Sequence, residues 1–140
     1  VIQEDLSLMT KPFVDKVSGF LPKGERFAFS YDEGKLILGI RRGMTDTVLG
    51  TIHTALSGST EARLTAAIAA ALAEDETSLI VVDDRMWDGS TLAKTLGVLE
   101  KAPCQVIVMT TLKPRGKKRP AWTYIEVSRK EGEPLEVRCD

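Results

Sequence analysis

The sequence has few of the residues that build disulfide frameworks or metal clusters. Its 140 residues contain two cysteines, Cys104 and Cys139, and one histidine, His53. Two cysteines so far apart in the chain indicate neither a disulfide scaffold nor a cysteine metal site, so a reducing cytoplasm is the expected location. A single histidine beside apolar residues is more often structural than catalytic.

A long apolar run and a strong net charge are also missing. No stretch approaches the ~20 apolar residues needed to span a bilayer, and the first residues lack the pattern of a signal peptide, so no membrane contact is expected. The formal net charge is -1, so contact with nucleic acid requires a local basic patch. With 43% hydrophobic and 28% charged residues, the composition predicts one soluble globular domain over 1–140.

The first part of the chain predicts a helix and a hairpin. Apolar residues recur at steps of three to four over 6–20, which favours an amphipathic helix. Alternation in the run ERFAFSY, followed by the turn Asp32-Glu33-Gly34, favours a hairpin over 25–40. Arg41 and Arg42 are expected to leave the sheet.

The rest of the chain predicts an α/β fold with a mainly parallel sheet. The expected elements are an Ala-rich helix over 56–73, a strand over 78–84, a strand over 104–111 and a terminal hairpin over 121–138. The two apolar strands are separated by a further helix, which is typical of parallel pairing. Their continuous apolar character predicts helices on both faces of the sheet, with antiparallel hairpins at the edges.

Two features of this region favour a ligand site. Asp83 and Asp84 follow the first apolar strand, and ligands of open α/β sheets bind beyond the carboxyl ends of strands. Such a pair can hold Mg²⁺ and can orient or deprotonate a water, although it can also simply cap the next helix. The Ser-Gly-Ser turn at 57–59 presents backbone N–H groups to an anion, or serves only as a helix cap.

Three short motifs resemble those of ABC-type ATPases. LSGSTEAR (56–63) resembles their signature motif, roughly LSGGQxxR, and SLIVVDD resembles the Walker B strand. VIVMTT resembles the strand that leads to the switch histidine. With the preceding helix and hairpin, their order resembles the C-terminal lobe of an ATPase head of the SMC/RecF/RecN/SbcC class of DNA-repair and chromosome-maintenance ATPases.

The resemblance implies a role for each matching residue. Asp83 would hold Mg²⁺ through water, Asp84 would take the place of the catalytic glutamate, and Thr111 would take the place of the switch histidine. Trp87 and Asp88 would belong to a loop that crosses a dimer interface. The signature residues would face the ATP bound by a second head, so that hydrolysis would need a homodimer; they are Leu56, Ser57, Gly58, Ser59 and Thr60.

Departures from the family pattern predict slow hydrolysis. Ser59 replaces the second signature glycine and Thr60 replaces the usual Gln or Glu. Asp84 is one methylene shorter than glutamate, and Thr111 lacks the chemistry of histidine. The sequence contains no GxxxxGK[ST] phosphate loop, so ATPase activity is expected only when an N-terminal P-loop lobe comes from another segment or chain.

A basic stretch suggests DNA as a partner. Five basic residues lie in a run broken by proline and glycine: Lys113, Arg115, Lys117, Lys118 and Arg119. Such a run can contact DNA phosphates, and it can equally be a solvated surface loop. The expected function is ATP binding and slow hydrolysis in DNA repair, recombination or chromosome maintenance.

Two other interpretations remain open. VVDDRMWDGST also resembles the diphosphoribosyl-binding motif of type I phosphoribosyltransferases, which Asp84, Gly89 and Thr91 match. Against this alternative, Asp88 would place a carboxylate where that family holds a phosphate. The second alternative is a degenerate ATPase lobe that does not hydrolyse ATP and acts as an interaction module.

Overall fold

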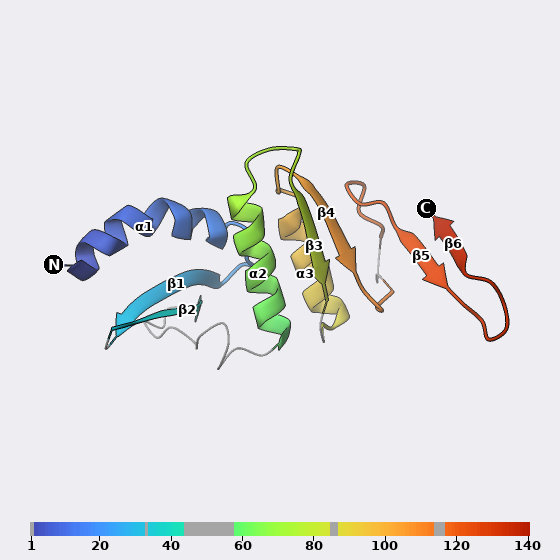
Figure 1. The fold of residues 1–140 in the computed structure, drawn as a ribbon, viewed down its shortest axis with the longest axis horizontal. Coiled ribbons are helices and arrows are strands. Elements are labelled where there is room, and N and C mark those ends of the chain that lie inside the picture. Colours follow the sequence, from blue (N-terminus) through green and yellow to red (C-terminus); the bar gives the residue numbers. More distant parts are fainter. Residues whose placement is uncertain (1, 33, 44–57, 85–86, 114–116) are drawn as a thin grey trace.

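The computed structural model describes residues 2–32, 34–43, 58–84, 87–113 and 117–140 (Figure 1). The elements are α1 (Ile2–Ser18), β1 (Glu25–Asp32), β2 (Lys35–Arg42), α2 (Gly58–Leu72), β3 (Leu79–Asp83), α3 (Gly89–Leu99), β4 (Gln105–Met109), β5 (Ile125–Ser128) and β6 (Glu136–Cys139). In this described part, no helix combines the length and apolar character needed to cross a membrane.

The described strands form three two-stranded sheets. β3 and β4 pair in parallel, with Leu79 opposite Gln105 and Asp83 opposite Met109, so the predicted parallel pairing is confirmed for these two strands. β1 pairs with β2 and β5 with β6, both antiparallel. A mainly parallel sheet is therefore seen only in part.

The N-terminal helix begins and ends earlier than expected, and the hairpin continues two residues further, to Arg42. α1 begins at Ile2 and continues through Pro12 to Ser18, where the sequence predicted 6–20. The ring of Phe13, the residue after Pro12, packs edge-on against Phe27 with centroids 6.0 Å apart, which attaches this part of α1 to β1. The expectation that Arg41 and Arg42 leave the sheet is wrong, because both belong to β2 and pair with β1.

Helix α2 lies at the centre of the fold and is buried on two sides (Figure 1). One side places Leu64 and Ala67 against α1 and the β1–β2 hairpin. The other side places Ala66 and Ala70 against β3 and α3. Alanine strongly favours a helix and is small enough to let both neighbours approach closely, so one residue type serves both needs.

The β3–β4 sheet is covered by helices on one face only within the described part of the chain. Ile80 and Val82 point toward α2 and α3 and are buried. The opposite face carries large apolar side chains that are 42–55% exposed: Leu79, Val81, Ile107 and Met109. The predicted second layer of helices is therefore absent from these residues. A continuous apolar strand indicates that both of its faces favour burial. It does not indicate whether helices of the same chain or another chain cover each face.

The terminal hairpin begins and ends later than the predicted 121–138, with strands at Ile125–Ser128 and Glu136–Cys139. Every residue of both strands is exposed. The segment before it is held on α3 by Arg119, whose guanidinium lies 2.9 Å from Glu100 Oε1. Gly97 gives this guanidinium room, because a Cβ at that position would lie 3.0 Å from Arg119 Nη2.

Two leucines of α2 provide a test of this core. Leu64 is fully buried and Leu72 is 62% exposed. Leu64→Ala should lower the free energy of unfolding by about 2–5 kcal/mol, because it removes buried apolar contacts and leaves a cavity. Leu72→Ala is the matched control and should change it by less than about 0.5 kcal/mol. Urea denaturation measures both, and equal effects would contradict the central position of α2.

Candidate functional site

The carboxyl end of β3 and the first turn of α2 lie at the same end of the molecule (Figure 1). A hollow of about 270 Å³ lies between the two elements and is lined by Gly58, Glu61 and Thr65 of α2 and by Asp83 of β3, among others. Alanines of α2 and the residues preceding Asp83 complete its lining. The structure thus brings a residue of the predicted phosphate-facing turn and a predicted Mg²⁺ residue to one surface depression.

The two aspartates at the carboxyl end of β3 have different environments. Asp83 is exposed and lies on the same face of the strand as Leu79 and Val81. Asp84 is 8% exposed, and its backbone N–H donates to the carbonyl of Met109 at 3.1 Å. The alternation of side chains along the strand therefore separates an accessible carboxylate from a buried one.

The buried carboxylate of Asp84 accepts a hydrogen bond from the hydroxyl of Thr110. The same hydroxyl oxygen accepts from the backbone N–H of Leu112 at 2.9 Å, which holds it in place. Thr110 and Thr111, the residue predicted to take the switch position, are both exposed, and it is Thr110 that donates to Asp84. The sequence analysis did not identify Thr110, although the parallel register contains the signal: Met109 pairs with Asp83, so the residue that follows β4 is level with Asp84.

The described residues could supply only part of the ligands that a Mg²⁺ ion needs. They contain no group of three or more His, Cys, Asp or Glu side chains that could hold a metal ion. Mg²⁺ is usually bound by one or two carboxylates together with phosphate oxygens and waters, rather than by an all-protein cage. The exposed carboxylate of Asp83 suits that mode, in which the remaining ligands come with a nucleotide.

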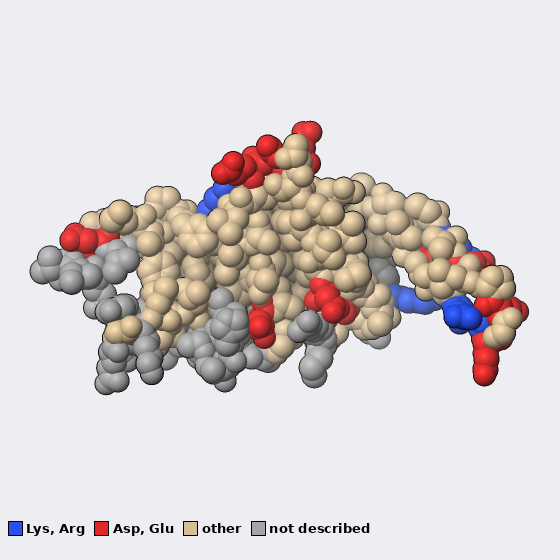
Figure 2. All heavy atoms as spheres, in the orientation of Figure 1, with Lys and Arg blue, Asp and Glu red and all other residues tan. Residues whose placement is uncertain are grey.

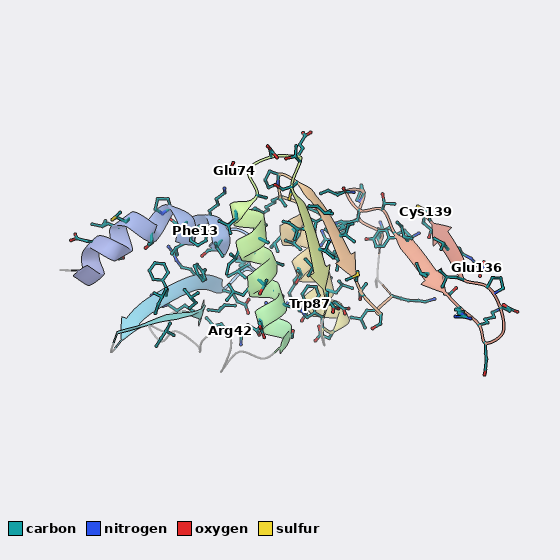
Figure 3. The ribbon with its side chains drawn as sticks, viewed as in Figure 1. Phe13, Arg42, Glu74, Trp87, Glu136 and Cys139 are labelled. Atoms are coloured by element: carbon teal, nitrogen blue, oxygen red, sulfur yellow. The ribbon has the colours of Figure 1, made fainter. Side chains whose placement is uncertain are left out.

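Trp87 and Asp88, which were predicted to form an interface loop, both make hydrogen bonds within this chain. Trp87 is 5% exposed, and its indole N–H donates to the backbone carbonyl of Ser59 at 3.0 Å. Figure 3 shows Trp87 near the lower end of α2. Asp88 caps α3, with its Oδ1 accepting from the backbone N–H of Thr91 at 2.7 Å. This hydrogen bond from the Thr91 N–H is the main cause that lowers the pKa of Asp88.

The predicted signature residues are only partly described. Leu56 and Ser57 lie outside the described residues. Gly58 is exposed at the start of α2, whereas Thr60 is 5% exposed. Ser59 is half-buried.

An ion-pair network joins the first turns of α2 to the N-terminal hairpin. Arg63 Nη1 lies 2.6 Å from Glu25 Oε2, and both side chains are nearly buried. Arg42 lies 3.0 Å from the same carboxylate and donates to Thr60 Oγ1 at 3.3 Å. The sequence offered no signal for Glu25, because its partner in the signature motif lies 38 residues further along the chain.

The basic stretch is largely paired with acidic residues. Lys113 Nζ lies 3.3 Å from a carboxylate oxygen of Glu126. Lys118 forms an ion pair with Asp140, and Arg119 forms one with Glu100. Lys117 is exposed, and Arg115 lies outside the described residues. Figure 2 shows basic and acidic atoms interspersed around the terminal hairpin, so this face carries no uniform positive field. The DNA contacts stay a prediction.

Comparison of the sequence with known protein families and with characterised proteins found no significant match. Comparison with solved structures found a similar fold in a chain from a study described as "Structural biochemistry of ATP-driven dimerization and DNA stimulated activation of SMC ATPases". The TM-score is 0.58 and the sequence identity 16%, and the match covers 98% of this chain and 88% of that chain. The fold of this chain is therefore similar to that of an SMC ATPase head.

The Thr110 hydrogen bond can be tested with two neighbouring threonines. Thr110→Val leaves the buried carboxylate of Asp84 without its hydroxyl donor and should lower the free energy of unfolding by about 1–3 kcal/mol. Thr111→Val is the matched control, because the next threonine is exposed like Thr110 but is not the residue that donates to Asp84, and it should change this free energy by less than about 0.5 kcal/mol. Chemical denaturation at pH 7 compares them. A larger loss for Thr111→Val would reverse the assignment of the two residues.

The cap of α3 predicts a pH dependence. Because the folded-state pKa of Asp88 is lowered, its ionisation stabilises the folded chain above the ordinary aspartate pKa of about 3.9. That contribution is lost as the pH falls below this value. Asp88→Asn keeps a capping side chain without the charge, so it should be less stable than wild type at pH 7, and this difference should be smaller at pH 3. Denaturation at both pH values measures it, and a difference that stays constant would contradict the assignment.

Proposed function

We propose that this chain is one lobe of an SMC-type ATPase head that binds ATP and Mg²⁺ together with a P-loop-bearing lobe and hydrolyses ATP slowly as a dimer of heads. The observation that carries the proposal is the position of Asp83 and Asp84. Asp83 ends the parallel strand β3 and Asp84 follows it, at the end of the sheet where ligands of α/β folds bind. The fold similarity to an SMC ATPase head supports the same interpretation.

The exposed face of the β3–β4 sheet is the proposed seat of the P-loop lobe. Leu79, Val81, Ile107 and Met109 form an apolar surface that gains stability when another apolar layer covers it. The face ends at Asp83, which lies on the same side of β3. A lobe seated there would bring its bound phosphates to the exposed carboxylate that suits Mg²⁺.

We propose different chemical roles for the two aspartates. Mg²⁺, when bound, would neutralise charge on the phosphate oxygens, and Asp83 would hold it through water. Asp84 would orient the attacking water, with one carboxylate oxygen fixed by Thr110. Aspartate is shorter than glutamate, so the water would lie farther from its ideal position, which accounts for the slow rate that we propose.

The first turn of α2 is proposed to face the ATP of a second head. Gly58 begins the helix and is exposed, so its backbone can approach a phosphate closely. The study of the similar structure concerns ATP-driven dimerization and DNA-stimulated activation of SMC ATPases. We extend both properties to this chain, with the charges of the basic stretch as the proposed DNA contact.

Titration with fluorescent ATP tests this proposal. The chain alone should not bind ATP tightly, and the chain mixed with its P-loop lobe should bind it with Mg²⁺ dependence. In that assembly Asp84→Asn should lower turnover by about 10²–10⁴-fold while leaving ATP binding intact, because it removes a water-activating group. Asp75→Asn is the matched control, since Asp75 is exposed and lies before β3.

Three outcomes would overturn the proposal. Binding of phosphoribosyl pyrophosphate by the chain alone would favour a phosphoribosyltransferase. ATP binding without any turnover in the wild-type assembly would favour a degenerate lobe. Equal turnover in wild type and Asp84→Asn would remove Asp84 from the mechanism.

A further inference from the structure

Trp87 connects the two parts of the proposed site within one chain. Its backbone N–H donates to the carbonyl of Asp84 at 2.8 Å, and its indole N–H donates to the carbonyl of Ser59 at 3.0 Å. One residue is therefore bonded both to the turn after β3 and to the first turn of α2. The indole side chain and the backbone of Trp87 thus form a direct hydrogen-bonded link between these two turns.

The environment of the indole ring makes this connection stiff. Trp87 is 5% exposed and belongs to the same apolar cluster as Ala66 of α2, Val82 of β3 and Leu92 of α3. Since the ring is packed on several sides, its N–H points in a fixed direction. A shift of the first turn of α2 relative to Asp84 would break a buried hydrogen bond and disturb this packing.

We propose that Trp87 is a positioning residue that couples the phosphate-facing turn of α2 to Asp84. The catalytic consequence rests on the proposed function, whereas the coupling itself is a property of this chain. Displacement at either turn is transmitted to the other through the indole. The ATP of a second head, bound at Gly58, would thereby bias the position of the carboxylate that serves the ATP on its own side. Such coupling is reciprocal, because it is a free energy shared by two sites.

The second tryptophan provides a matched control. Trp122 packs against the same apolar cluster, but its buried indole nitrogen has no hydrogen-bond partner among the described residues. Replacement of either tryptophan by 3-benzothienylalanine keeps the bicyclic ring and removes only the N–H group. The substitution at 87 should therefore break the coupling, and the one at 122 should leave it unchanged. This isostere avoids the cavity that Trp87→Phe would create.

The first experiment uses the chain without nucleotide. Thr110→Val releases the carboxylate of Asp84 without changing its charge, and amide chemical shifts then report the response in residues 59–63 of α2. With Trp87 intact, these amides should shift. With the isostere at 87 the shifts should be lost, whereas the isostere at 122 should leave them as they are. Equal shifts in all three backgrounds, or none with Trp87 intact, would overturn the coupling.

The second experiment uses the assembly with the P-loop lobe. The isostere at 87 should lower kcat about tenfold, because a misplaced carboxylate and a lost hydrogen bond raise the barrier. The affinity of single heads for ATP should stay within about twofold, since Trp87 does not contact the P-loop side. A purely structural role would lower thermal stability and leave kcat per folded head unchanged, which would contradict the inference. If the assembly binds no ATP while the shift changes persist, the proposed function fails and the coupling stands.

Discussion

The central constraint of this structure is that helix α2 is buried on two sides at once. A helix with one apolar stripe can satisfy one neighbour, whereas α2 packs against the N-terminal helix and hairpin on one side and against β3 and α3 on the other. Alanine makes this possible, because larger side chains would push the two layers apart. The position of α2 in turn fixes the position of its first turn, and hence the geometry of the candidate site.

The site illustrates how a parallel strand pair sorts neighbouring side chains. Asp83 and Asp84 are adjacent in the sequence, yet one is exposed and the other is buried and hydrogen-bonded to Thr110. Two identical carboxylates thereby acquire different environments, one exposed to solvent and the other buried and hydrogen-bonded. The divergence requires no special residue, only the alternation of side chains along β3 and one hydroxyl directly after the neighbouring strand β4.

Much of the element order could be predicted from the sequence, because apolar periodicity and turn residues act locally. The Ala-rich run and the two apolar strands are examples. The exposed second face of β3 could not be predicted, since periodicity cannot identify which chain covers a surface. Thr110 was missed in favour of Thr111 because a motif position was preferred to the strand register. The roles of Trp87 and Glu25 depend on contacts 28 and 38 residues away, and no local pattern encodes those.

The terminal hairpin has a consequence for how tightly lobes of this kind can associate. β5 and β6 place Ile125, Val127 and Val137 on one side, and all three are 57–62% exposed. A two-stranded hairpin is at best marginally stable in water, so its order depends on the surface it meets. If a second lobe covers it, part of the favourable free energy of association is used to order the hairpin. We therefore expect this end of the chain to exchange its amide protons fastest when free, and to make association more readily reversible than its apolar area alone would predict.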